Sequence, residues 1–194
     1  MTTTVYTDED GMIEADLRSW SREVLEVPNP HLRGLPACPF AMQAWRENKV
    51  FVVETDAFMD DCRKFCADFT GLEKDLVVVA TYDIPDIDDL AELVEGLHLE
   101  FPNLHCMQFH PDYSAEDAEL DFLTDNDWES ATDCAYAMLF IQDLRLVVEA
   151  SDKLEPLGYY EAYPVDEYES LVAQRKRRLI HGYETSCNET RRQG

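Results

Sequence analysis

The stretch LHCMQFHPDY, residues 104–113, decides the expected fold. Its first residues are mostly apolar and predict a short strand, which Pro111 ends because proline has no N–H group to donate to a sheet. In α/β proteins, ligands bind and chemistry takes place at the carboxyl ends of strands. The sequence therefore places a candidate site at His110 and the residues that follow it.

Upstream of this stretch, two further apolar runs predict strands at 50–54 and 76–81. Both are rich in valine, and an apolar run without polar alternation is typical of a strand covered on both faces. Apolar residues at helical spacing separate the predicted strands. Helices are expected over about 13–26 and 87–100, and a further one between Thr55 or Asp56, which can cap it, and Gly71, which closes it. Strands that alternate with helices form βαβ units, which predicts mainly parallel neighbours in the sheet.

Downstream of the stretch, the chain is expected to be largely helical. Residues 128–148 have apolar side chains near helical spacing. The end of this segment, LRLVVE at 144–149, is also compatible with an edge strand, so both interpretations stay open. A last helix is expected from Asp166, and the basic run 175–178 lies in its final turns, where cations offset the helix dipole.

These elements define an α/β fold. It consists of a small, largely parallel or mixed sheet of three to five strands with flanking helices and a helical C-terminal third. A single domain is expected over 13–181, between a loose N-terminus at 1–12 and a disordered tail at 182–194.

Acidity is the strongest compositional feature. The chain has 194 residues, with 41 Asp or Glu against 16 Lys or Arg, and a net charge of −25. Such a chain repels the phosphates of nucleic acids and of anionic membranes, so neither is an expected partner. Three explanations stay open: a solvated surface, an interface for a basic protein partner, or adaptation to high salt. Association into a homo-oligomer is a further alternative.

The N-terminus and the cysteines indicate a cytoplasmic protein. No window of 18 residues is uniformly apolar, and the N-terminus lacks the basic and apolar regions of a secretory signal. Outside an oxidising compartment, the 6 cysteines are expected to be free thiols. Cys62 and Cys66 share the apolar face of one predicted helix and are expected in the core.

Cys38 is the cysteine that the sequence favours for chemistry. It precedes Pro39, and proline is common in the first turn of a helix. Free N–H groups and the dipole at a helix start lower the pKa of a thiol and make it reactive. Cys38 is therefore a candidate nucleophile, redox thiol or soft metal ligand. The alternative is a small buried apolar residue, as free cysteines often are.

His110 is the matching candidate for a base or a metal ligand. Asp112 and Tyr113 follow it closely and can orient it or donate hydrogen bonds. On a strand, Cys106 shares the face of His110 but lies about 13 Å away, and His105 points to the opposite face. This stretch alone therefore cannot bind zinc. The alternative is a histidine at a strand end whose ring is satisfied by the backbone.

Three hypotheses for function follow. The first is a small enzyme that acts on a small-molecule substrate through Cys38, His110, Asp112 and Tyr113; the sequence does not identify the substrate. The second is a non-catalytic acidic accessory protein that binds a basic protein partner through its charged surface and the aromatic loop at 158–164. The third is a transition-metal site that joins Cys38 and His110 with Asp112, whose ligands would favour Zn, Cu or Fe over Mg.

Residues 38–41 (CPFA), the strand at 50–54 and residues 109–113 (FHPDY) together resemble an uncharacterised bacterial family, a domain of unknown function. Its members have an N-terminal Leu-Cys-Pro-Phe-Ala motif after a helix with a tryptophan, here Trp20, and a central Phe-His-Pro motif. The family's Asn-Arg-Ser-Pro-Tyr-Pro segment has no clean match in this chain. The resemblance implies that Cys38 and the Phe-His-Pro histidine form one site, but it supplies no reaction.

Overall fold

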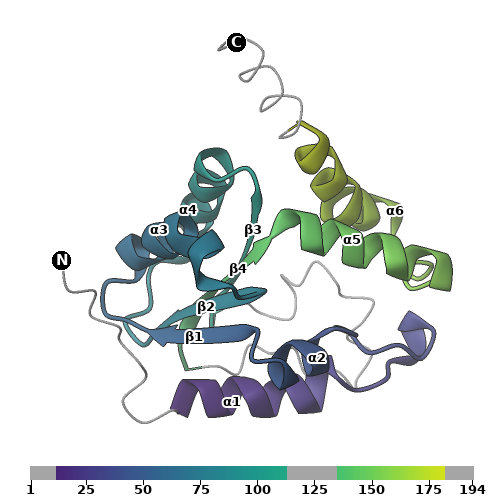
Figure 1. Cartoon of the computed structure of the whole chain (residues 1–194), viewed down its shortest axis with the longest axis horizontal. Coiled ribbons are helices and arrows are strands. Elements are labelled where there is room, and N and C mark those ends of the chain that lie inside the picture. The colour runs from purple at the N-terminus through teal and green to yellow at the C-terminus, as the bar shows by residue number, and fades with distance from the viewer. Residues whose placement is uncertain (1–11, 113–134, 182–194) are drawn as a thin grey trace.

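The computed structural model describes residues 12–112 and 135–181. It contains a four-stranded sheet whose strands lie in the order β1-β2-β4-β3. Helices flank the sheet and make up most of the C-terminal third (Figure 1). The predicted α/β fold with a small mixed sheet is therefore confirmed. The strands are β1 Val50–Glu54, β2 Leu76–Thr81, β3 Leu104–Phe109 and β4 Ala137–Asp143.

The helices follow the predicted periodicity closely in the first hundred residues. They are α1 Met12–Trp20, α2 Ala41–Arg46, α3 Phe58–Asp68, α4 Ile87–Glu100, α5 Leu144–Leu154 and α6 Val165–Tyr168. Short π-helical turns, Ser21–Leu25 and Glu169–Ala173, continue α1 and α6, and the chain is helical again over 174–181. Within the described ranges, no helix is both long and apolar enough to cross a membrane.

The directions of the strands bring three carboxyl ends to one edge of the sheet. β1 and β2 pair in parallel. β4 runs antiparallel to both of its neighbours, β2 and β3. β3 therefore runs in the same direction as β1 and β2, and the residues that follow these three strands lie at the same edge.

The position of β4 corrects the prediction that 128–148 is mostly helical. Its first five residues, 137–141, are all buried, because β4 lies inside the sheet with a neighbour on each side. Periodicity alone cannot distinguish such a short apolar run from a buried helix. The following LRLVVE segment is the start of α5, not an edge strand, and the Asp143 carboxylate caps it by accepting the Arg145 N–H at 2.7 Å.

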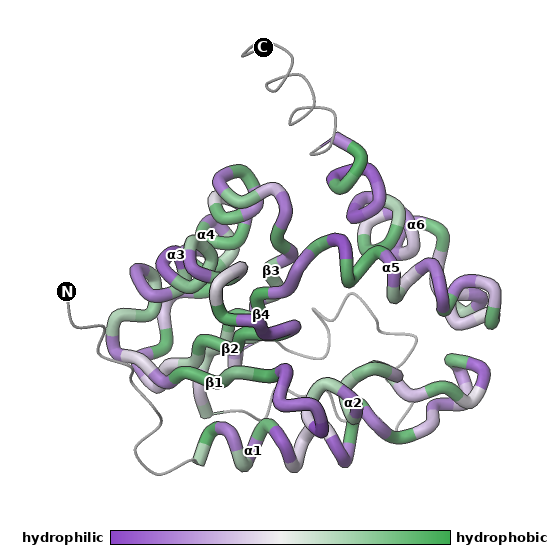
Figure 2. Tube along the Cα trace, in the orientation of Figure 1, coloured by the Kyte–Doolittle hydropathy of each residue, from purple (hydrophilic) through white to green (hydrophobic). Residues whose placement is uncertain are grey.

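Two apolar clusters pack on the two faces of the sheet. α3 and α4 cover one face, and α1 covers the other, with α2 beside it (Figure 1). Cys106 packs with α3 and α4, whereas Met107 and Phe109 pack on the side of α1, which confirms the predicted alternation along β3. Figure 2 shows the same pattern, with hydrophobic residues concentrated in the strands and alternating with hydrophilic ones along the helices.

A third apolar cluster joins two segments that are far apart in the sequence. Leu32, Leu154 and Tyr159 are buried together, and Tyr160 and Tyr163 pack against them. The Tyr159 hydroxyl donates a hydrogen bond of 2.5 Å to the carbonyl oxygen of Ala37. Tyr159 of the aromatic loop at 158–164 is therefore part of a core, whereas Tyr160 and Tyr163 are half-buried, and the role of this loop in binding a partner stays a prediction.

Candidate functional site

His110 lies at the end of β3 with only 3% of its surface exposed. Its Nε2–H donates a hydrogen bond of 3.0 Å to the carbonyl oxygen of Pro85, in the loop that follows β2. Its Nδ1 accepts the backbone N–H of Asp112, also at 3.0 Å. The roles of the two nitrogens follow from these partners, because a carbonyl can only accept and an N–H can only donate.

This bonding pattern limits what His110 can do chemically. A general base needs a free nitrogen lone pair within reach of a substrate proton, and the Nδ1 lone pair already faces the Asp112 N–H. The Asp112 carboxylate lies 3.9 Å from Nδ1 and its side chain is 85% exposed, so it does not orient the ring through a hydrogen bond. The arrangement agrees with the second interpretation of His110, in which backbone groups form hydrogen bonds with the ring of a histidine at a strand end.

Cys38 precedes α2, but its environment does not activate the thiol. Burial raises the pKa of the Cys38 thiol, and this effect outweighs the lowering by hydrogen bonds from the backbone of Phe40 and Ala41. The nearby Glu26 adds a further increase. The predicted low pKa is therefore wrong. The effect of a helix start on the pKa of this thiol is also weak here, because α2 begins only at Ala41 and has 6 residues.

Cys38 and His110 form hydrogen bonds with different parts of the described chain. The Cys38 N–H donates to the Leu25 carbonyl at 2.9 Å, and its carbonyl accepts the Ala41 N–H at 3.1 Å. His110 contacts the loop after β2 instead. Among the described residues, no group of three or more His, Cys, Asp or Glu side chains is arranged to hold a metal ion. Cys38, His110 and Asp112 thus form no such group, and Tyr113 lies outside the described residues.

Cys62 and Cys66 of α3 are part of the core, as predicted, and so is Cys106 of the sheet. Cys62, Cys66 and Cys106 are buried in the cluster under α3 and α4, and each is a free thiol, as is Cys38. The sulfur atoms of Cys66 and Cys106 are 3.9 Å apart. Burial raises the pKa of the Cys62 thiol far above its usual value. Cys134 and Cys187 lie outside the described residues.

A pair of histidines covers the edge of β3, and no local pattern of residues predicts it. His98 of α4 accepts the backbone N–H of Cys106 through Nε2 at 3.0 Å, and its ring stacks on His105 with 5.9 Å between centroids. Arg178 donates to the Leu104 carbonyl at 2.8 Å. These side chains bind backbone groups that an edge strand would otherwise expose to other chains.

Burial dominates the protonation of this pair. Burial, with a smaller contribution from the nearby Arg178, lowers the pKa of His98 to about 4. Burial also holds the pKa of His105 well below its usual value, with contributions from Arg175, His98 and Arg178. Neither ring nitrogen of His105 has a hydrogen-bond partner within the described part of the chain. The surroundings of the pair therefore favour the uncharged form of both imidazole rings.

The carboxyl edge of the sheet, where β1, β2 and β3 end, carries exposed carboxylates. Neither lysine nor arginine occurs in the described segments 54–61, 82–89 and 110–112, which form this edge. Helix geometry accounts for part of the charge, because Asp86 caps α4 by accepting the Asp88 N–H at 2.9 Å. We call the exposed aspartates there the acidic edge: Asp56, Asp60, Asp83, Asp86, Asp88, Asp89 and Asp112.

Two exposed apolar side chains interrupt the acidic edge. Tyr82 is 46% exposed and Ile84 is 41% exposed, and both belong to the loop that follows β2. The Tyr82 ring packs edge-on against the buried Tyr136, with 5.6 Å between centroids. The loop is held further by the Asp83 N–H, which donates to the Thr81 hydroxyl at 3.1 Å, and by the bond from His110 to Pro85.

Comparisons of this chain with models of known protein families, with curated proteins and with solved structures found no match.

Proposed function

We propose that this chain is a non-catalytic acidic protein that binds a basic protein partner through the acidic edge. The observation that carries the proposal is the placement of the exposed aspartates at one edge of the sheet, with no lysine or arginine in the segments that form it. Charge of one sign that is concentrated on one surface steers an oppositely charged partner and orients it.

The composition of the edge also supports a protein partner over a simple cation. Protein interfaces combine an apolar centre, often with an aromatic residue, and a polar rim. Tyr82 and Ile84 supply exposed apolar area between the carboxylates of Asp83 and Asp86. A divalent cation would make no use of these two side chains.

The edge is held in shape before any partner arrives. Tyr82 packs on Tyr136, and the Pro85 carbonyl is bonded to His110. A surface that is already ordered loses less conformational entropy on binding. In this proposal, His110 is a positioning residue: it holds the loop after β2 in place and does not contact the partner.

The carboxylates are not all explained by the fold. Asp86 caps α4, and Asp88 and Asp89 lie in its first turn, where negative charge interacts well with the helix dipole. Asp83 precedes the helix and Asp112 follows β3, so this explanation covers neither of them. The enzyme hypothesis stays a prediction. The contacts of Cys38 and His110 support it less well than the acidic edge supports the binding of a basic protein.

The experiment starts with purification of the chain, in native complexes, from cells that express it, at low salt. The partner is identified, and its dissociation constant is then measured by biolayer interferometry. The edge variant is Asp83→Lys with Asp112→Lys, and the control variant is Asp68→Lys with Glu95→Lys. Both variants change the net charge equally at exposed positions.

The proposal predicts a partner of high isoelectric point whose binding weakens about tenfold or more in the edge variant, with little change in the control. Each charge reversal removes an attraction and adds a repulsion at the same place. Binding should also weaken as salt screens the charges. An equal loss of binding in both variants, or a partner that is not basic, would overturn the proposal.

A further inference from the structure

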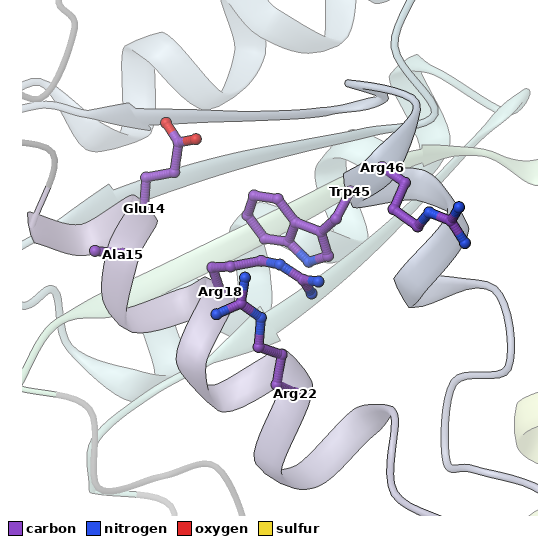
Figure 3. Close-up of a pocket in the computed structure, with 6 residues that line it drawn as sticks. All are labelled: Glu14, Ala15, Arg18, Arg22, Trp45 and Arg46. Atoms are coloured by element: carbon purple, nitrogen blue, oxygen red, sulfur yellow. The ribbon is translucent and has the colours of Figure 1, made fainter.

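A groove of about 670 Å³ is lined by residues of α1, its π-helical continuation and α2. These helices lie on the side of the sheet opposite to α3 and α4 (Figure 1). The lining of the groove comes from two helices that lie far apart in the sequence but side by side in the fold. This volume is within the range of sites for small organic molecules, about 300–1,000 Å³. The residues that line it are Glu14, Ala15, Arg18, Arg22, Trp45 and Arg46 (Figure 3).

The charge of this groove is opposite to that of the chain. Three arginines and one glutamate line it, whereas the whole chain has a net charge of −25. Glu14, Arg18 and Arg22 follow one another at four-residue spacing along α1 and its π-helical continuation, and so lie near one face. Positive charge is scarce in this protein, and here it is concentrated around one concave surface.

One arginine is fixed by the protein, and two are available. Arg18 forms an ion pair with the Glu26 carboxylate and lies over the Trp45 ring, with 5.4 Å from its Cζ to the ring centroid. Arg22 and Arg46 form no ion pair with any residue that the structure describes, and both are exposed. The Glu26 carboxylate therefore pairs with Arg18, and the guanidinium groups of Arg22 and Arg46 are open to an anion from solution.

Figure 3 shows how the side chains lie. Arg18 and Arg22 lie together on the α1 side of the Trp45 ring, Glu14 points up from the preceding turn of α1, and Arg46 extends outward beside Trp45. The groove thus combines an aromatic ring, cations on both of its helices and one carboxylate. Such a combination suits a ligand with a planar ring and a negative group.

We propose that this groove, which we call the arginine–tryptophan groove, binds a small organic phosphate that carries a planar aromatic ring, as a nucleoside monophosphate does. This site is separate from the acidic edge and does not depend on the proposed protein partner. The Arg22 guanidinium donates paired hydrogen bonds to phosphate oxygens, for which its planar shape is well matched, and Arg46, which extends outward beside Trp45, adds positive charge. The ring of the ligand stacks on the Arg18 guanidinium, which itself lies over Trp45.

Two further groups define the ligand. The Arg18 guanidinium lies against Trp45 and is held there by Glu26, so the indole ring is ordered before binding. The Glu14 carboxylate is an acceptor on the same helix face and suits a hydroxyl or amino group of the ligand. A bare phosphate ion would use only the charges of Arg22 and Arg46, and an uncharged ring would use only the stack of Arg18 on Trp45.

Isothermal titration calorimetry with adenosine 5′-monophosphate tests the inference on the full chain. Adenosine and inorganic phosphate are titrated separately, so that the ring and the phosphate are each tested alone. The binding variants are Arg22→Gln, Arg46→Gln and Trp45→Leu. The control is Arg63→Gln, which removes one positive charge from an exposed position on α3. Thermal melting of each variant verifies that it is folded.

The expected result is saturable binding of the monophosphate, with adenosine and inorganic phosphate each about tenfold or more weaker. Loss of one charged hydrogen-bonding partner weakens binding about tenfold or more, so Arg22→Gln should reduce affinity, and Arg46→Gln should reduce it less. Trp45→Leu should also reduce affinity because it removes the ring on which Arg18 lies, while Arg63→Gln should not. The proposal is overturned if the monophosphate does not bind, if adenosine or phosphate alone binds as tightly, or if Arg63→Gln weakens binding as much as Arg22→Gln.

Discussion

The imidazole of His110 and the carbonyl group of Pro85 are joined by a hydrogen bond of 3.0 Å, although β4 lies between the strands that precede them. This bond ties the end of β3 to the loop after β2 across the carboxyl edge of the sheet. It gives the Phe-His-Pro sequence a structural role that does not require a substrate. It also links the most conspicuous histidine of the chain to the shape of the acidic edge.

Replacing His110 by Ala should lower the free energy of unfolding by about 2–4 kcal/mol, because it leaves a cavity and removes the partners of the Pro85 carbonyl and the Asp112 N–H. Urea unfolding measures this change. The matched control is Asp112→Ala, since only the backbone of Asp112 bonds to the ring, and it should change stability by less than about 0.5 kcal/mol. An unchanged His110→Ala protein would show that the bond does not support the fold.

Alkylation of Cys38 by iodoacetamide at pH 7 should be slower than that of an unfolded cysteine, because burial raises the pKa of its thiol. Peptide mass spectrometry separates it from the other thiols. Cys62, which lies in the core, is the internal reference for a protected site. Rapid reaction of Cys38, with an apparent pKa below about 8.5, would restore the enzyme hypothesis and the predicted activation of this thiol.

The histidine pair should make the protein less stable as the pH falls from about 6.5 towards 4. Below the ordinary histidine pKa of 6.5, the unfolded chain takes up protons that His98, with a folded pKa of about 4, and His105 do not bind. Stability is therefore full above the unfolded pKa and decreases as the pH falls, by at most about 1.4 kcal/mol per pH unit for each ring.

The variant His105→Phe tests this pH dependence, because it keeps a ring in the core and removes both unpaired nitrogens. Its urea midpoint should decline less than that of the wild type between pH 7 and pH 4.5. His31→Gln, at an exposed position, is the control and should keep the wild-type slope. The comparison between variants cancels the contribution of the many carboxylates. Parallel slopes for wild type and His105→Phe would contradict the low pKa of His105.

Truncation of Ile141 to Ala should cost about 2–5 kcal/mol, since this residue is fully buried in the middle of β4. Leu99→Ala, at a position that is 85% exposed, should cost less than about 0.5 kcal/mol. Chemical denaturation measures both. A small effect at Ile141 would be inconsistent with a central strand at this position.

The sequence alone was sufficient to predict the local helices and strands of the first hundred residues. Period-3.6 patterns define the helices up to α4, and the runs of β-branched residues at 50–54 and 76–81 define β1 and β2. The alternation of Cys106 and Met107 between the two faces of β3 also follows from the sequence, because successive side chains on a strand point in opposite directions. Each of these features depends only on near neighbours in the chain.

Tertiary structure decided the rest. Ala137–Asp143 is a strand because β2 and β3, far away in the sequence, pair with its backbone on both sides. Burial raises the pKa of Cys38 against the local effect of the neighbouring N–H groups. The approach of Trp45 to Arg18 and the bond from His110 to Pro85 join separate elements. Pairing and desolvation depend on groups that are distant along the chain, so a local pattern does not contain them.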